Sequence, residues 1–353
     1  MAPAPEHILI VKLSAIGDVI HTLPALNVLR RQYPGAHITW LVEEAAAGLL
    51  QGHPALDRVL VSRRKYWLQG LKGSQRGHHA AQMLAFFREL RDTRYEMILD
   101  FQASLKGSLL IALARGARKI GFGRGLEHQE HSYLFLNEKV PAVDMEIHAL
   151  TRGLLLLGQL GIPTRRIEYD LPVTRRERER IAHLLSASGA APQAKLVAIN
   201  PVAQWETKLW GNRKFAALAD LLRERYDVTV VFTGGPADRA IVTAITAQMH
   251  HQALDLTGCT NLLELAALYE RAACLVSTDT GPMHLGAAVG IPVVALFGPT
   301  APWRTGPFGE GHRIVRADCT CAPCYQRSCE TCQCMAGITV AQVAAAVEQL
   351  QIL

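Results

Sequence analysis

Hydrophobic residues along the chain fall into two alternating patterns. Short, uninterrupted apolar runs, such as residues 8–11 and 196–199, are typical of strands buried on both faces of a parallel sheet. Longer segments between such runs, for example residues 19–30 and 215–226, carry apolar residues at helical spacing. The repeated order of strand and helix predicts the α/β class, with doubly wound parallel sheets.

The same pattern places each element. Strands are expected at residues 8–11, 38–42, 56–61, 97–100, 196–200, 228–233, 275–277 and 293–297. Helices are expected at residues 19–30, 81–90, 105–114, 146–160, 175–185, 215–226, 237–249 and 261–269, from residue 282 onward, and at 340–350. Residues 66–80 are polar and contain glycine, which indicates a loop or lid.

These elements divide into two domains. Residues 163–172 contain two prolines and two arginines and are the expected linker region. We therefore place a first Rossmann-like domain at residues 1–165, a second at 166–335 and a closing C-terminal helix at 336–353. Sheets of this kind bind ligands at the carboxyl ends of their strands, so a cleft between the two domains is expected to hold the site.

Composition and charge narrow the class of function. The 353 residues are 49% hydrophobic and carry a net charge of +6. That basic excess suits an anionic substrate or membrane surface, and it is too small to predict a nucleic-acid partner. Because the sequence shows neither a membrane-spanning apolar run nor a signal-peptide pattern, we expect a cytoplasmic protein whose cysteines are mostly reduced.

One strand-to-helix turn is the strongest candidate site. Asp279, Thr280 and Gly281 separate an expected strand from a helix that begins near Pro282. Unpaired N–H groups and the helix dipole suit such a turn to a phosphate or diphosphate, and His284 lies about one turn further on. An ordinary turn, in which Asp279 or Thr280 only caps the helix, fits the same residues.

A second turn carries a candidate base. Asp18 follows Gly17 at the first strand-to-helix turn, where a carboxylate is placed to accept a proton from a substrate hydroxyl. A helix-capping aspartate is the alternative, although Lys12 and Ser14 nearby favour a functional turn. The glycine spacing differs from GxGxxG, so the dinucleotide fingerprint is absent.

Two more turns carry charged candidates. Lys208, in the polar loop of residues 200–210, is suited to neutralise a diphosphate, with a solvated surface lysine as the alternative. Asp238 follows two glycines and is suited to hold ribose hydroxyls, with a first-turn helix acid as the alternative. Six cysteines crowd into residues 319–334, and two pairs of them have the CxxC spacing of zinc ligands.

Taken together, residues 10–26, 200–210 and 279–284 resemble glycosyltransferase family 9, the lipopolysaccharide heptosyltransferases, and residues 10–26 are similar to the heptosyltransferase I type. The resemblance spans nearly the whole chain. It implies a GT-B fold, with two Rossmann-like domains facing across a cleft. It also implies inverting, metal-independent transfer of heptose from ADP-heptose to the lipopolysaccharide inner core, on Kdo-lipid A or a heptose acceptor.

The resemblance also assigns roles. It makes Asp18 the catalytic base and Lys208 the diphosphate lysine. It makes the donor-binding turn Asp279, Thr280, Gly281 and His284. The family usually has glutamate where Asp238 stands. Family members often carry several cysteines in the cysteine-rich loop without a required metal, so we assign no metal and no cofactor.

Basic residues of the first domain are candidates for the acceptor, whose Kdo carboxylates and phosphates suit the fork of an arginine. Two clusters follow expected strands: Arg63, Arg64 and Lys65, then Arg118, Lys119 and Arg124. We expect the acceptor to contact Ser14, Gly17, Arg63, Arg64 and Arg124. Trp67 and Leu68 would help to rest the enzyme peripherally on the anionic inner leaflet. A solvated basic face is the alternative.

Two other functions fit the same residues. One keeps the GT-B fold but uses a different nucleotide sugar for another cell-surface glycan. The other is a nucleotide- or metal-binding module organised by the cysteine-rich loop. A screen of donor sugars separates the first from heptose transfer, and an Asp18→Ala variant separates the second.

Overall fold

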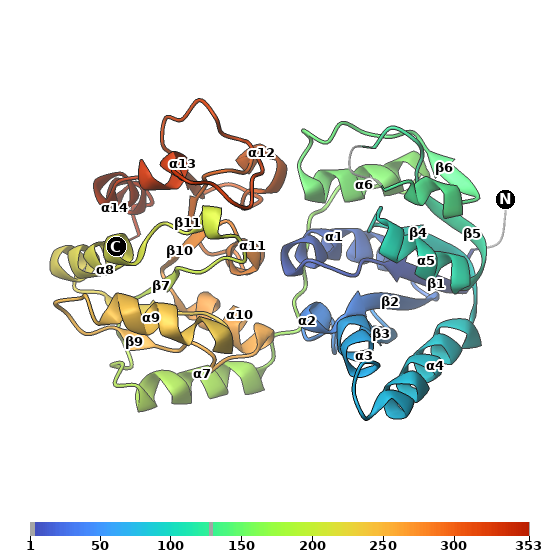
Figure 1. Cartoon of the computed structure of the whole chain (residues 1–353), viewed down its shortest axis with the longest axis horizontal. Coiled ribbons are helices and arrows are strands. Elements are labelled where there is room, and N and C mark those ends of the chain that lie inside the picture. Colours follow the sequence, from blue (N-terminus) through green and yellow to red (C-terminus); the bar gives the residue numbers. More distant parts are fainter. Residues whose placement is uncertain (1–3, 127–129, 353) are drawn as a thin grey trace. The chain divides into compact units, whose positions relative to one another are not determined.

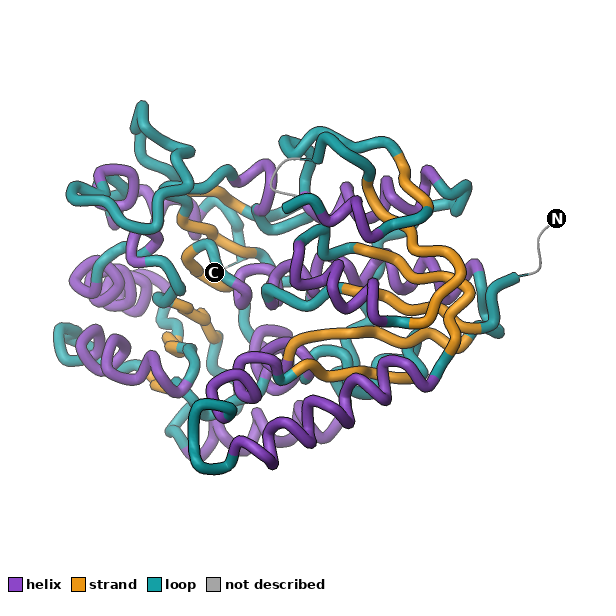
Figure 2. The backbone as a smooth tube through the Cα atoms, turned by 45° about the vertical axis from the view of Figure 1, so that its right-hand side comes forward, coloured by secondary structure: helices purple, strands orange, loops and turns teal. Residues whose placement is uncertain are grey.

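The computed structural model describes residues 4–126 and 130–352. The chain forms two compact units, Met1–Pro172 and Val173–Leu353. In each unit the strands run through the middle and the helices lie outside them (Figure 1, Figure 2). Each sheet has six strands, and every strand pair is parallel. The predicted α/β class with doubly wound parallel sheets is confirmed.

The first sheet has the order β3-β2-β1-β4-β5-β6. Its strands are β1 (His7–Val11), β2 (His37–Glu43), β3 (Arg58–Ser62), β4 (Arg94–Asp100), β5 (Arg115–Phe122) and β6 (Glu138–Val140). Ile8 of β1 lies in register with Ile38 of β2 and Met97 of β4. Because β1 is central, its apolar run is fully buried.

The helices of the first unit pack in two groups. The first group is α1 (Ile16–Gln32), α2 (Glu44–Ala47) and α6 (Ala149–Gln159). The second is α3 (Arg64–Gly70), α4 (Arg76–Asp92), α5 (Leu105–Leu113) and the 3₁₀ turn η1 (Ser132–Phe135). Apolar residues of α3, α4 and α5 form one buried cluster with β1 and β4.

Residues 66–80 are not the expected loop or lid. Helix α3 covers their start and α4 begins at Arg76. Trp67 explains the error, because its side chain is only 5% exposed and packs against Phe86, with ring centroids 5.2 Å apart. Most residues on these two helices are polar and exposed, so the apolar periodicity that would predict a helix is weak.

The second sheet has the order β12-β11-β10-β7-β8-β9. Its strands are β7 (Leu196–Asn200), β8 (Thr229–Phe232), β9 (Leu254–Asp255), β10 (Cys274–Thr278), β11 (Val293–Leu296) and β12 (Arg313–Val315). Val276 of β10 lies in register with Ile199 of β7 and Val294 of β11. All three side chains are fully buried.

The second unit also has two groups of helices. One is α8 (Asn212–Tyr226), α9 (Arg239–Thr246) and α14 (Val340–Glu348), and the other is α7 (Arg175–Ala187), α10 (Leu262–Arg271) and α11 (Gly281–Ala288). Short helical segments are η2 (Glu206–Lys208), η3 (Pro236–Asp238), α12 (Pro302–Thr305) and α13 (Gln333–Ala336). Helix α14 packs on α8 and β12, so the chain end is part of this unit.

Four strands were missed because they lie toward the sheet edges. β5 and β6 end the first sheet, while β9 and β12 are the two edges of the second. The missed β5 contains Arg118 and Lys119, so the expectation that these two residues follow a strand is wrong. The first five residues of β5 are exposed or half-buried, so charged residues are tolerated there. The strand therefore lacks the continuous apolar run that marks a central strand.

The strand orders place two switch points. In the first unit β1 lies between β2 and β4, and in the second unit β7 lies between β8 and β10. The connections after adjacent central strands therefore lead away in opposite directions and leave a crevice at their carboxyl ends. The loops after β1 and β4, and those after β7 and β10, are where each unit is built to bind a ligand.

Candidate functional site

Asp18 lies at the switch point of the first unit. It is the third residue of α1, and its Oδ2 accepts a hydrogen bond of 3.1 Å from the backbone N–H of Ala15. The Nζ of Lys12 lies 3.9 Å from the same oxygen. The Asp18 side chain is 42% exposed. It therefore caps the helix and still presents a carboxylate to a ligand.

A cavity of about 220 Å³ opens beside Asp18. Loops after β1 and β4 line it, together with Phe122 and the helix α6. Arg152 of α6 also lines it and donates to the carbonyls of Met145 and Ile147. The sequence analysis missed Arg152, because nothing in a helical pattern shows which cation turns toward a cavity.

Gln102 holds the two loops of this site together. Its side-chain oxygen accepts hydrogen bonds from the backbone N–H groups of Leu13, at 2.8 Å, and Ser14, at 3.2 Å. Lys12 also reaches across, donating from Nζ to the carbonyl of Phe101 at 3.0 Å. The turn that carries Asp18 is therefore fixed to the end of β4 by groups that lie far away in sequence.

Asp100 is a second carboxylate in the same cavity. It ends β4, is 2% exposed and accepts backbone hydrogen bonds from Gln102, at 3.0 Å, and Ala103, at 2.9 Å. Burial raises the pKa of Asp100 to about 6, against the opposing effect of those two N–H groups and Lys12. The sequence showed an aspartate at a strand end but gave no sign of its burial.

Ser14 and Gly17 lie in the loop and first turn around Asp18. The Ser14 hydroxyl accepts a hydrogen bond of 2.5 Å from Nζ of Lys106, which also lies 3.4 Å from Oε1 of Glu43. Gly17 is buried in the first turn of α1. Of the two, Ser14 is the one that belongs to a polar network at the strand ends.

The predicted acceptor arginines fall into two places. Arg63 and Arg64 follow β3, where Nε of Arg63 lies 3.0 Å from Glu44 and Arg64 lies 3.9 Å from Glu43. A cavity of about 250 Å³ adjoins Arg63. Arg124 is exposed and follows β5, on the other side of β1 in the sheet. The structure therefore does not bring these three cations together.

Three other expectations for the basic face need correction. Arg118 is paired with Glu138 through two hydrogen bonds of 2.7 Å, and Lys119 donates to the carbonyl of Ala112. The Glu138 carboxylate raises the pKa of Arg118. Trp67 is buried and is not a membrane anchor, whereas Leu68 is 47% exposed.

Lys208 and Asp279 form the centre of the site in the second unit. Nζ of Lys208, at the end of η2, lies 2.5 Å from Oδ2 of Asp279, the residue after β10. The side chains are 15% and 6% exposed, and Oδ2 also accepts a hydrogen bond of 2.6 Å from Thr300. Asp279 therefore positions Lys208, while its negative charge makes it a poor direct ligand for a phosphate.

The ring of Trp205 contacts two cations. Nζ of Lys208 is 4.5 Å from the centroid of its ring, and the guanidinium carbon of Arg327 is 4.9 Å away. Contacts of this kind hold a cation by the charge distribution of the ring. Arg327 was missed because it lies in the cysteine-rich loop, far from η2 in the sequence.

The turn at Thr280 has the geometry of a helix N-terminus. Thr280 precedes α11 in an extended conformation, and Gly281 and Pro282 are the first two helical residues. His284 lies in the first turn and is 7% exposed. N–H groups at the start of a helix suit an anion, although here Pro282 has no N–H and the Met283 N–H donates to the Thr280 carbonyl at 3.1 Å.

Asp238 makes a local contact. Its Oδ2 accepts a hydrogen bond of 2.7 Å from the backbone N–H of Gly235, across the turn η3. The side chain is partly exposed, so a ligand can reach it. Capping is therefore shown for Asp238, and its role toward a ribose stays a prediction.

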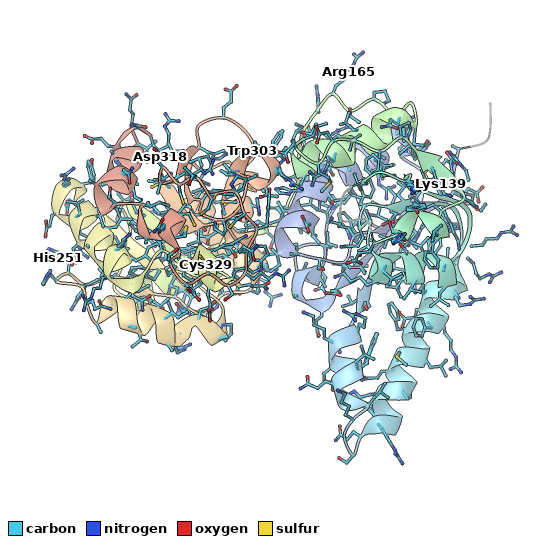
Figure 3. The ribbon with its side chains drawn as sticks, turned by 45° about the horizontal axis from the view of Figure 1, so that its top comes forward. Lys139, Arg165, His251, Trp303, Asp318 and Cys329 are labelled. Carbon is cyan, nitrogen blue, oxygen red and sulfur yellow. The ribbon has the colours of Figure 1, made fainter. Side chains whose placement is uncertain are left out.

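The cysteines are free thiols (Figure 3 labels Cys329). Within residues 4–126 and 130–352, His, Cys, Asp and Glu side chains form no group of three or more that could hold a metal ion. In the same part of the chain, no helix combines the length and the apolar character needed to cross a bilayer.

Two doubly wound units, with a carboxylate at one switch point and a lysine beside a helix N-terminus at the other, define a glycosyltransferase of the GT-B class. Comparison with known families identifies the family within this class. The profile of glycosyltransferase family 9 (heptosyltransferase) matches residues 83–334. The chain belongs to that family.

Individual relatives agree with this assignment. Pseudomonas aeruginosa lipopolysaccharide heptosyltransferase 1 is 30% identical over 330 residues, which cover 91% of this chain and 87% of the relative. Haemophilus influenzae lipopolysaccharide core heptosyltransferase OpsX is 26% identical over 314 residues, covering 88% and 84%. The solved E. coli heptosyltransferase WaaC with ADP-2-deoxy-2-fluoro heptose superposes with a TM-score of 0.76 at 25% identity, covering 97% and 99%.

Proposed function

We propose that the chain transfers heptose from ADP-heptose to the lipopolysaccharide inner core, on Kdo-lipid A or a heptose acceptor, with inversion and without a metal ion. The observation that carries the proposal is Asp18, a partly exposed carboxylate beside a cavity at the switch point of the first unit. Support for the substrates comes from relatives named as lipopolysaccharide heptosyltransferases and from the solved neighbour bound to an ADP-heptose analogue.

The second unit is the proposed donor site. Lys208 supplies a positive charge that Asp279 and Trp205 hold in one place. The N-terminus of α11, with Thr280, Gly281 and His284, supplies backbone donors for the diphosphate. Asp238 is the proposed contact for the ribose. Protein cations and N–H groups thus take the part that a metal ion plays elsewhere.

The first unit is the proposed acceptor site and supplies the base. Asp18 accepts the proton of the acceptor hydroxyl while the oxygen of that hydroxyl attacks the anomeric carbon of the donor sugar. The bond from that carbon to the diphosphate breaks, and Lys208 offsets the negative charge that develops on the leaving group. Attack from the side opposite the leaving group inverts the configuration.

Basic and apolar groups of the first unit support the proposed acceptor. Arg63, Arg64 and Arg124 are exposed cations suited to Kdo carboxylates and lipid A phosphates. Ser14 and Gly17, in the loop and first turn beside Asp18, are further proposed acceptor contacts. Leu68 and Tyr66, both 47% exposed beside Arg63 and Arg64, suit a peripheral contact with the anionic inner leaflet of the membrane.

An Asp18→Asn variant tests this mechanism. Asparagine keeps an oxygen for the Ala15 N–H but cannot take a proton, so kcat is expected to fall by about 10²–10⁴-fold. Glu177→Gln is the matched control, because Glu177 caps α7 in the same way, from its third residue. Transfer is measured in EDTA, where wild-type activity is expected to persist. Wild-type rates in Asp18→Asn would remove Asp18 from the chemistry.

A donor screen tests the substrate. Thermal unfolding is followed with ADP-heptose, ADP-glucose, UDP-GlcNAc and GDP-sugars. We expect ADP-heptose to raise the melting temperature most. At equal concentration, the ligand that binds the folded state most tightly stabilises it most. Stronger stabilisation by another nucleotide sugar would replace heptose transfer with a different GT-B reaction.

A further inference from the structure

We propose that Cys329 and Cys332 form a redox-active dithiol whose oxidation to a disulfide is transmitted to the donor site through Arg327 and Trp205. The two residues have the CxxC spacing and lie just before helix α13. The backbone N–H of Cys332 points at Sγ of Cys329 at 3.4 Å, and Sγ of Cys332 lies 3.4 Å from the Cys329 carbonyl. These contacts place the sulfur of each cysteine against the backbone of the other.

The surroundings favour Cys329 as the attacking thiol. Its side chain is exposed. Backbone N–H groups of Cys332 and Thr331 lower the pKa of Cys329, since they stabilise a thiolate. Cys321 is equally exposed, but the Cys319 thiol, 3.2 Å away, raises the pKa of Cys321 to about 11. The chain therefore contains an internal control: two exposed thiols with opposite electrostatic environments.

The chemistry needs an external disulfide as oxidant, and oxidised glutathione is the probe. The Cys329 thiolate attacks one sulfur of the probe, forming a mixed disulfide and releasing one glutathione thiolate. Cys332 then loses its proton and attacks the Cys329 sulfur, which forms the Cys329–Cys332 bond and releases the second glutathione thiolate. The protein loses two electrons and two protons, and one disulfide is reduced to two thiols.

Contacts around residue 326 connect this pair to the donor site. The hydroxyl of Thr207 donates to the carbonyl of Gln326 at 2.7 Å, directly beside Lys208. The guanidinium carbon of Arg327, two residues before Cys329, lies 4.9 Å from the ring centroid of Trp205, the ring that Lys208 also contacts. The same loop donates from the backbone N–H groups of Cys324 and Tyr325 to the Pro299 carbonyl, next to the Thr300 that bonds Asp279. Closing a ring just after Arg327 changes the position that Arg327 can adopt.

Peptide mapping tests the dithiol. The reduced wild-type protein is treated with oxidised glutathione, digested without reductant and analysed by mass spectrometry. We expect a Cys329–Cys332 disulfide, which forms equally well in Cys321→Ser. In Cys332→Ser the reaction is expected to stop at glutathione on Cys329, and with limiting iodoacetamide Cys329 is expected to be alkylated before Cys321. Equal labelling of the two thiols, or a thiol pair blocked by a bound metal until a chelator is added, would overturn the proposal.

Trp205 fluorescence tests the transmission without depending on activity. Oxidation is expected to change the emission of the wild type but not that of Trp205→Phe or Cys329→Ser. Because the consequence for donor binding rests on the proposed function, ADP binding is measured separately by calorimetry. We expect oxidation to weaken it about two- to fivefold, the effect of one exposed cation–π contact. An unchanged Trp205 signal overturns the transmission, whereas an altered signal with no ADP binding counts only against the proposed function.

Discussion

Lys208 is held in place by other residues of the fold rather than by solvent. Its partners are the Asp279 carboxylate and the face of Trp205, and Thr300 holds the carboxylate in turn. An ammonium group fixed in this way costs little to reorganise when charge develops on a leaving diphosphate. The same arrangement complicates a simple alanine test, because removing Lys208 leaves a buried carboxylate unpaired.

A pair of substitutions separates the two effects. Lys208→Met is expected to weaken ADP binding about ten- to a hundredfold, which corresponds to roughly 1.5–3 kcal/mol for a lost charge-assisted bond. It is also expected to lower the melting temperature. Adding Asp279→Asn should restore the melting temperature but not ADP binding, as measured by thermal unfolding and calorimetry. Recovery of both would mean that Lys208 acts only as the counter-ion of Asp279.

Asp100 predicts a dependence of stability on pH. Because its pKa in the folded protein is about 6, above the ordinary 3.8, the folded state holds the proton more tightly than the unfolded state. Its contribution to stability is therefore complete below about pH 4 and is lost as the pH rises through 6. Asp100→Asn keeps the acceptor for Gln102 and Ala103 and removes this titration.

Urea unfolding measures the effect as a difference between the two proteins. The stability of Asp100→Asn relative to wild type is expected to increase between pH 4 and pH 7, by up to roughly 3 kcal/mol. Taking the difference cancels every other titrating group. A constant difference across this range would show that Asp100 remains ionised when it is buried.

At the scale of elements, the turn after β1 depends on the loop after β4. Gln102 accepts from the backbone of both Leu13 and Ser14, so one side chain fixes the entry to α1 and, with it, Asp18. These strands are neighbours in the sheet although four helices and two other strands separate them in the chain. Order in this turn is a consequence of sheet topology.

Gln102→Leu is expected to lower the free energy of unfolding by about 1–3 kcal/mol, because two backbone donors lose their acceptor. It should also lower kcat more than it changes ADP binding, since the proposed donor site lies in the other unit. Chemical unfolding and the transfer assay measure the two quantities. Gln69→Leu, on the exposed face of α3, is the control. Loss of ADP binding in Gln102→Leu would contradict the assignment of separate roles.

At the scale of the whole molecule, the positive charge is spread unevenly around the first sheet. The net charge is +6, yet Arg118 is neutralised by Glu138 while Arg124 is an exposed cation. Arg63 and Arg64 lie near β3, on the opposite side of β1 from Arg124. Either group alone is therefore expected to contact only part of a large anionic acceptor.

Replacing Arg63 and Arg64 together, or Arg124 alone, with alanine is expected to raise the acceptor KM and leave ADP binding nearly intact. The effect should shrink as salt rises, because exposed charges are screened. Arg118→Ala is the matched control and should leave the acceptor KM unchanged. Acceptor kinetics and ADP calorimetry on the same proteins test whether these arginines act on the acceptor alone. Equal loss of both would show that the acceptor has been placed wrongly.

The sequence alone determined the class of fold and the central strands. Continuous apolar runs such as β1 and β10 are local features, because a strand buried on both faces needs apolar residues at every position. Strand β5, beside the edge strand β6, and helix α3 were missed, since their burial depends on what packs against them. Asp18 and Lys208 could also be proposed from sequence, because the polar residues that follow a strand are a local feature, and their roles stay predictions.

Tertiary structure decided which of these residues meet. Distant segments are joined by the ion pair of Lys208 with Asp279, by the contact of Arg327 with Trp205 and by the hydrogen bonds of Gln102 to the β1 turn. The burial of Asp100 and of Trp67 was likewise decided by tertiary packing. Such contacts follow from the order of strands in the sheets, and that order is set by the packing of the whole chain rather than by any local pattern.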